Sequence, residues 1–141
     1  MVGYTTLGTN DLPRATAFYD ALLGEFGVKQ LMNNGRMVMY GKSFGNGILA
    51  ICTPFDKQKA TPGNGVMVAL NMESEENVKK LHAKALALGL TIDPGFEFPL
   101  PIGGINYLNF RFLGRQDTQV AVLFAGVLAA GNIQRPKALF N

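Results

Sequence analysis

The sequence predicts an α+β fold made of two copies of one unit, in which a strand and a helix are followed by three further strands. The main observation is a near repetition 63 residues apart, which aligns Asp11 with Ser74 and Phe18 with Leu81. The second is size. With 141 residues and 48% apolar content, the chain can bury one core, or two half-size units packed together.

The first unit begins with a short β-prone run at residues 2–8, followed by a helix that extends to about Leu23. Asp11 is the predicted N-cap of this helix, and Pro13 falls in the first turn, where a missing N–H does little harm. Apolar residues then recur at three- and four-residue spacing, which predicts one buried helix face. That face consists of Ala15, Phe18, Ala21 and Leu22.

Three β-prone runs complete the first unit, at about 28–33, 36–42 and 47–53. The separators Asn33-Asn34-Gly35 and Gly45-Asn46-Gly47 are typical of hairpin turns, because Asn and Gly tolerate positive φ. The stretch from Thr53 to Gly65 contains Pro54, Pro62 and several charges, which is typical of a connection between units. We therefore divide this single domain into a first unit (1–55), a linker (56–64), a second unit (65–126) and a tail (127–141).

The second unit repeats the order, with a predicted strand at 65–72, a helix from the Ser74 cap to Leu88, and β-prone segments near 90–97, 105–113 and 119–126. Prolines and glycines interrupt its middle, which predicts a loop that could close over a ligand. The interrupting residues are Pro94, Gly95, Pro99, Pro101, Gly103 and Gly104.

Composition argues against several classes of partner. The net charge of +3 is spread without a dense basic stripe, which disfavours nucleic acid. Apolar runs end well short of the roughly 18–20 residues of a membrane span. The first twenty residues contain Asp11, Pro13 and Arg14 where a signal peptide would be apolar. A single cysteine, Cys52, excludes an internal disulfide. We expect a soluble, cytoplasmic protein with no nucleic-acid or membrane partner.

The opening Tyr4–Tyr19, with its pattern D-L-x-x-A-x-x-F-Y, resembles that of the glyoxalase/bleomycin-resistance/extradiol dioxygenase proteins, the vicinal oxygen chelate superfamily. Val66–Gly89 resembles the second module of that superfamily, and the resemblance extends to about Ala125. Arg115–Gln119 lies where the family has an acidic, glycine-containing turn. The resemblance implies two βαβββ modules whose mixed sheets curl around a shared cleft, with the helices outside.

The resemblance also implies where a divalent metal would bind. Its ligands would stand seven residues before Asp11, at the matching point of the second module, and on the last strand of each module. These positions hold Tyr4, Met67, Ala50 or Cys52, and Val122. Metal sites of this family use imidazole nitrogen and carboxylate oxygen, which this set does not provide. We therefore expect no metal and no other cofactor.

Other catalytic signals are weak. His82, the only histidine, falls on the second predicted helix, where we expect a partly exposed structural residue, since a general base needs a pocket around it. Cys52 lies in an apolar strand and is expected to be a small buried hydrophobe rather than a nucleophile. No hydrolytic triad emerges, and the Gly-rich segments lack the strand-to-helix context of a phosphate loop.

Side-chain alternation predicts which residues line a cleft. In the strand from Ile105 to Phe112, Tyr107, Asn109 and Arg111 share the face away from the helices. This face forms a small-molecule pocket if it is enclosed, and an ordinary solvated sheet face if it is not. The residues expected to contact a ligand are Tyr4, Thr6, Cys52, Met67, Asn71, Tyr107, Asn109, Arg111 and Val122.

Arg111 is the most discriminating member of this set, because its guanidinium suits a carboxylate or phosphate. An internal partner such as Asp117 or Glu97 would weaken that interpretation. The sequence leaves two main functions open. One is a metal-free binder of an aromatic or carboxylated small molecule, and the other is a lyase, isomerase or dioxygenase with a non-standard or absent metal site. A purely structural role is a third.

Assembly is a further expectation. Proteins of this resemblance commonly pair, which suggests a homodimer. The tail from Val127 to Asn141 contains Leu128, Leu139 and Phe140, and is therefore expected to dock on the chain's own body or on a second subunit.

Overall fold

The computed structural model describes residues 2–61 and 67–89, and after them the backbone of five short strands. The fold is α+β, with mixed sheets and two α-helices, as predicted. In the first half the elements are β1 (Tyr4–Gly8), α1 (Leu12–Leu23), the 3₁₀ turn η1 (Gly24–Phe26), β2 (Lys29–Asn33), β3 (Met37–Gly41) and β4 (Ile48–Cys52). The predicted elements of this half are therefore confirmed to within two residues.

The first sheet has the order β1-β4-β3-β2, in which β1 and β4 are parallel and the other pairs antiparallel. Side-chain acceptors close the β2–β3 turn. Asn33 Oδ1 accepts the Gly35 N–H (3.0 Å) and Asn34 Oδ1 accepts the Met37 N–H (2.8 Å). Gly35 alone carries positive φ in this turn, at 82°. The asparagines thus act through their side chains rather than through a left-handed backbone.

Helix α1 begins as predicted, with the Asp11 carboxylate accepting the Arg14 N–H at 3.0 Å. Its buried face differs from the prediction, because Tyr19 and Leu23 are buried whereas Phe18 and Ala21 are only partly buried. Spacings of three and four residues fit both stripes, so the periodicity could not distinguish them. Tyr19 packs against Tyr40 of β3, with ring centroids 6.0 Å apart.

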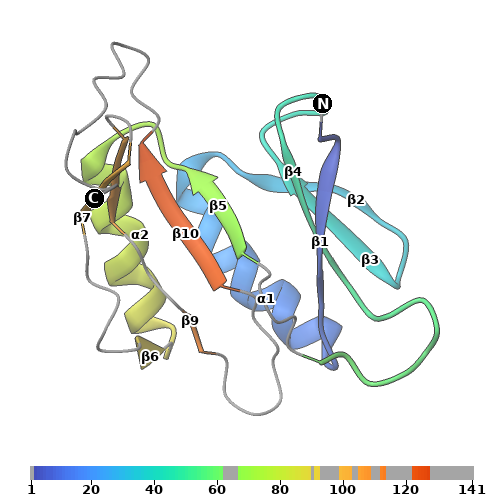
Figure 1. Ribbon diagram of the computed structural model, residues 1–141. Coiled ribbons are helices and arrows are strands. Elements are labelled where there is room, and N and C mark those ends of the chain that lie inside the picture. The colour runs from blue at the N-terminus through green and yellow to red at the C-terminus, as the bar shows by residue number, and fades with distance from the viewer. Residues whose placement is uncertain are drawn as a thin grey trace, which may run out of the picture.

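The second half contains β5 (Met67–Asn71), α2 (Glu75–Ala87), β6 (Thr91–Ile92), β7 (Pro99–Ile102), β8 (Ile105–Leu108), β9 (Phe112–Leu113) and β10 (Val122–Val127). Helix α2 begins at the predicted cap, where Ser74 Oγ accepts the Asn77 N–H at 3.1 Å. A second four-stranded sheet has the order β5-β10-β8-β7, with β5 parallel to β10, while β6 pairs with β9 (Figure 1). In each four-stranded sheet, the strand that comes first along the chain is therefore the parallel neighbour of the strand that comes last along the chain.

The prediction of a loop at Pro99 and Pro101 was wrong, because both residues lie in β7. Proline lacks the N–H donor of a ladder, which is why prolines in a sequence predict a loop rather than a strand. Within the described part of the chain, β7 is the edge strand of its sheet and pairs only with β8. Residues at alternate positions direct their N–H groups to the same side of a strand, so the two missing donors lie on one side. An edge strand has one side without a partner, where missing donors do not interrupt a ladder.

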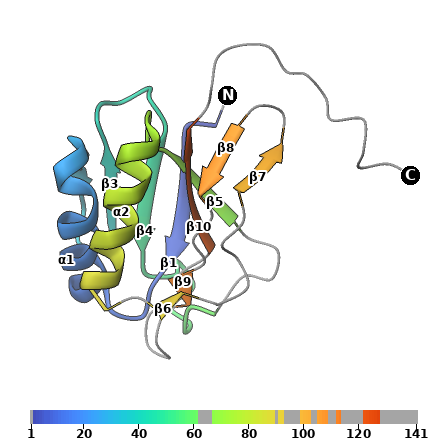
Figure 2. The ribbon, with the colours of Figure 1, turned by 90° about the vertical axis from the view of Figure 1, so that its left-hand side faces the viewer.

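The two helices cover one face of the sheets and share a core (Figure 2). Leu22 of α1 and Leu81 of α2 are both fully buried in it, together with Leu7, Leu49 and Ile51 from the first sheet. An ion pair from Lys84 to Glu25 also joins α2 to η1. Truncating a leucine buried in this way typically costs about 2–5 kcal/mol. Neither described helix is long and apolar enough to cross a membrane.

The connection after β4 packs against the first unit as far as it is described. Asn10 and Ala60 exchange two hydrogen bonds, with Asn10 Nδ2 donating to the Ala60 carbonyl (3.2 Å) and the Ala60 N–H donating to Asn10 Oδ1 (2.8 Å). Ala60 is 5% exposed. Residues 62–66 lie outside the described residues, so the linker boundary at 56–64 stays a prediction.

Alkaline pH should destabilise the protein through its buried tyrosines. Burial, together with the nearby Asp20 carboxylate, raises the pKa of Tyr40 well above 10.0. The unfolded chain then loses the Tyr40 proton near pH 10 while the folded chain keeps it, so stability falls as pH rises. We expect the stability advantage of wild type over Tyr40→Phe to shrink between about pH 8 and about pH 11. Urea unfolding at each pH measures this.

The matched control is Tyr4→Phe, which removes a half-exposed phenol from the opposite face of the first sheet. A wild-type advantage over Tyr40→Phe that stays constant across the same pH range would contradict the prediction.

Candidate ligand-binding pocket

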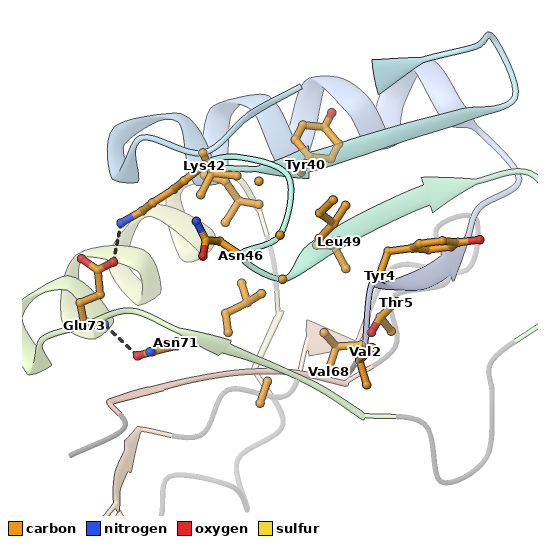
Figure 3. A pocket seen from close by; sticks show the side chains of 18 residues that line it. Val2, Tyr4, Thr5, Tyr40, Lys42, Asn46, Leu49, Val68, Asn71 and Glu73 are labelled. Atoms are coloured by element: carbon orange, nitrogen blue, oxygen red, sulfur yellow. Dashed lines mark hydrogen bonds and ion pairs between the residues drawn. The ribbon is translucent and has the colours of Figure 1, made fainter. Parts of the chain in front are cut away.

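A pocket of about 640 Å³ lies between the edge of the first sheet and the edge of the second, below α1 (Figure 3). Among the described strands, β1 pairs only with β4, and β5 only with β10, so each has one side with no described strand beside it. Both strands contribute to the walls. Residues lining the pocket include Val2, Tyr4, Thr5, Leu23, Val28, Tyr40, Lys42, Asn46, Leu49, Val68, Leu70, Asn71 and Glu73.

The interior of the pocket is apolar because it borders the shared core. Tyr40 and Leu49 are almost fully buried, and Val68 and Leu70 of β5 are partly buried against the same cluster. The Tyr40 phenol points away to α1, where it donates to the Thr16 carbonyl at 3.2 Å. An apolar ligand surface therefore finds apolar side chains on both sides of the pocket.

Polar groups lie at the rim of the pocket. Lys42, which follows β3, pairs with Glu73, which precedes α2, with Nζ and Oε1 2.5 Å apart (Figure 3). Asn71 Oδ1 accepts the Glu73 N–H at 3.1 Å. Because the Lys42 and Glu73 side chains are 49% and 62% exposed, water screens the pair and its contribution to stability is small. It nevertheless connects the two sheets at the pocket mouth.

Glu73 has an unusual backbone. Its φ is 66°, in the left-handed region that side chains other than Gly, Asn and Asp rarely adopt. Its N–H donates to Asn71 Oδ1, and its carboxylate pairs with the Lys42 ammonium. Strain of this kind concentrates at ligand clamps and switch regions.

Two of the residues expected to contact a ligand line this pocket, namely Tyr4 and Asn71. Tyr4 is 52% exposed, which leaves much of its ring open to a ligand. The Asn71 amide oxygen is already used in the turn to Glu73. Their role as ligand contacts stays a prediction.

Thr6 and Cys52 do not line the pocket. Leu7 is buried on the helix side of β1, whereas Thr6 is exposed on the other face. The pocket instead uses Thr5, whose alternation matches Leu7. Cys52 is buried at the end of β4, as expected of a small hydrophobe.

The remaining expected contacts lie on the second sheet or beyond it. Met67 and Val122 are register partners in β5 and β10, and Tyr107 lies in β8 opposite Gly126. Asn109 and Arg111 lie outside the described residues. These assignments therefore stay predictions.

Sequence reasoning did not single out Thr5, Leu49, Lys42 or Glu73, all of which line the pocket. The Lys42–Glu73 pair joins residues 31 apart, and neither residue stands in a motif. No local signal in the sequence could have found that pair.

The positions where the resemblance places metal ligands do not fit a divalent ion. β1 carries Tyr4, and the facing strand β4 offers Ala50 or Cys52, so this sheet supplies no imidazole or carboxylate there. Met67 and Val122 stand side by side on the other sheet. Within residues 2–61, 67–89 and the later strands, no three His, Cys, Asp or Glu residues are grouped so as to hold a metal. His82 is half-buried on α2 and does not line the pocket.

Comparison with known proteins gives matches among solved structures. No family model and no curated protein matches the sequence. A glyoxalase/bleomycin resistance protein from Albidiferax ferrireducens is 28% identical with a TM-score of 0.70, over 92% of this chain and 99% of that chain. A lactoylglutathione lyase from Agrobacterium tumefaciens is 18% identical with a TM-score of 0.57, over 90% and 92% of the two chains. A genomically encoded fosfomycin resistance protein from Listeria monocytogenes is 22% identical with a TM-score of 0.58, over 91% and 94%.

The left-handed backbone at Glu73 predicts an unusual order of substitutions. In a Lys42→Ala background, where the ion pair is already absent, we expect Glu73→Gly to be more stable than Glu73→Ala by about 1 kcal/mol, since glycine, unlike alanine, adopts this φ without strain. Urea unfolding of the two double variants measures the difference. At an ordinary backbone position alanine would be the more stable, and that order would contradict the prediction.

Proposed function

Because this chain belongs to the vicinal oxygen chelate superfamily, we propose that it is a metal-free, glyoxalase/bleomycin-resistance-like protein that binds a small molecule between its two halves. The observation that carries this proposal is the pocket between β1 and β5. Its volume of about 640 Å³ lies within the range of about 300–1,000 Å³ typical of small-molecule sites.

The ligand we propose is aromatic or carboxylated. The apolar interior around Leu49 and Val68 suits a ring, and the half-exposed Tyr4 ring offers a surface for edge or offset stacking. Lys42 supplies a cation at the mouth, although a carboxylate would have to compete with Glu73 for it. Arg111 is proposed as a second anion-binding group.

The proposal includes two βαβββ modules whose sheets curl around the ligand. The matching parallel pairs, β1 with β4 and β5 with β10, support this architecture. We also propose that the protein is cytoplasmic and forms a homodimer. The tail at 128–141 lies outside the described residues, and its docking on the body or on a second subunit belongs to the same proposal.

A superfamily enzyme with a non-standard or absent metal site is the alternative. The likeness to a lactoylglutathione lyase favours considering it, although at 18% identity that likeness concerns the fold alone. Elemental analysis of the purified protein separates the two. Stoichiometric zinc, iron, manganese or nickel would support the enzyme and overturn the metal-free proposal.

Filling the pocket should abolish ligand binding. We expect 1-naphthoate, an aromatic carboxylate, to raise the melting temperature of the wild-type chain. Val68→Phe places a larger side chain in the pocket and should remove that increase. Met32→Phe is the matched control, since Met32 is on β2, 37% exposed and away from the pocket.

Thermal unfolding of all three chains, with and without 1-naphthoate, gives the result. Each variant must first melt cooperatively without ligand, which separates loss of binding from loss of fold. An equal increase in wild type, Val68→Phe and Met32→Phe would place the ligand elsewhere. Naphthalene-1-methanol has the same ring system but no carboxylate. If it binds the wild-type chain as tightly as 1-naphthoate does, the carboxylate is not recognised, and the anionic part of the proposal is wrong.

A further inference from the structure

A second hollow of about 920 Å³ lies where β1 leads into α1 and β4 leads into the following loop. We call it the basic groove. It is lined by Thr9, Asn10, Arg36, Thr53 and the loop residues Pro54, Phe55, Lys57, Gln58 and Lys59. It shares no lining residue with the pocket between β1 and β5.

The charge of the basic groove has one sign. Arg36, Lys57 and Lys59 line it, and none of its described lining residues carries a carboxylate. The acid of this loop, Asp56, is not among them, and its Oδ1 accepts the Gln58 N–H at 3.0 Å. Cations gathered in a concave surface attract anions, and a dianion most strongly.

An aromatic ring stands beside these cations. Phe55 is 87% exposed, which is unusual for a phenylalanine. The Arg36 guanidinium lies over the Phe55 ring, with its central carbon 5.6 Å from the centroid, and Nη1 donates to the Thr53 carbonyl at 2.9 Å. The exposed ring can therefore stack with a flat ligand group next to three positive charges.

The loop that carries Phe55 is held in place. The Asn10–Ala60 hydrogen bonds fix its end against α1, and the Lys57 N–H donates to the Pro54 carbonyl at 3.2 Å. Lys57 has a φ of 62°, a left-handed conformation that a lysine rarely adopts. A binding surface that is already formed loses less conformational entropy on binding.

We propose that the basic groove is a second binding site, which takes a phosphate-bearing compound with a flat ring, such as a nucleoside monophosphate. The ring stacks on Phe55, and the phosphate lies between Lys57 and Lys59. Arg36 keeps the Phe55 ring in position and adds to the positive field. Both parts of the ligand contribute, so neither a ring nor a phosphate alone binds as well.

The chain contains no tryptophan, which makes a fluorescence test direct. Phe55→Trp keeps an aromatic ring at this position and introduces the only tryptophan. Titration with adenosine monophosphate should change its emission, with an affinity roughly tenfold above those for adenosine and for inorganic phosphate. Calorimetry of the unsubstituted chain repeats the comparison without the reporter, and so covers the case that Phe55→Trp disturbs the loop.

Charge removal tests the position of the phosphate. Lys57→Asn with Lys59→Gln removes two charges, and asparagine tolerates the left-handed backbone at position 57. Affinity for adenosine monophosphate should fall roughly fivefold. The control, Lys29→Gln with Lys80→Gln, removes the same charge outside the groove and should leave affinity unchanged. Equal affinity for adenosine and adenosine monophosphate, or equal losses in both double variants, would overturn the proposal.

Discussion

The other features depend on one constraint, namely that in each four-stranded sheet the first strand along the chain pairs in parallel with the last. β1 can lie parallel to β4 only if the chain crosses back between them, and α1 with the β2–β3 hairpin makes that return. Among the strands that the structure describes, this pairing leaves β1 with one unpaired side, and the same arrangement of β5 and β10 leaves β5 with another. The pocket lies between these two sides.

Local signals in the sequence predicted the elements well. The caps at Asp11 and Ser74 and the turn at Asn33–Gly35 act within three or four residues, so a short stretch contains the whole interaction. Features set by distant parts of the chain could not be predicted in this way. The strand at Pro99–Ile102 depends on being an edge, and the buried face of α1 depends on where Tyr40 lies. Of the residues expected to contact a ligand, Tyr4 and Asn71 line the described pocket, whereas Lys42 and Glu73 at its mouth were not expected, because they are 31 residues apart and stand in no local motif.

The chemistry at the metal-ligand positions and the chemistry of the pocket are consistent with each other. Tyr4 stands where the resemblance implies a metal ligand, and its large, half-exposed ring lines the pocket. A ring at this position offers a broad contact surface rather than one strong directional bond. Recognition would then depend on shape and apolar area, with orientation given by a few rim groups such as Asn46 and Lys42.

The length of β1 keeps the pocket and the basic groove apart. Thr5 lines the pocket and Thr9 lines the basic groove, so about 13 Å of extended chain separates them. Between them lie Leu7, which is buried in the core, and Gly8, whose ideal Cβ would meet the Ala60 side chain at 3.2 Å. A small ligand cannot span both sites through this packed segment. The two sites are nevertheless connected through three strands, because Thr5, Tyr40 and Leu49 line the pocket while Thr9, Arg36 and Thr53, at the other ends of β1, β3 and β4, line the basic groove. The Asn10–Ala60 hydrogen bonds extend the β1 connection to the loop that carries Phe55.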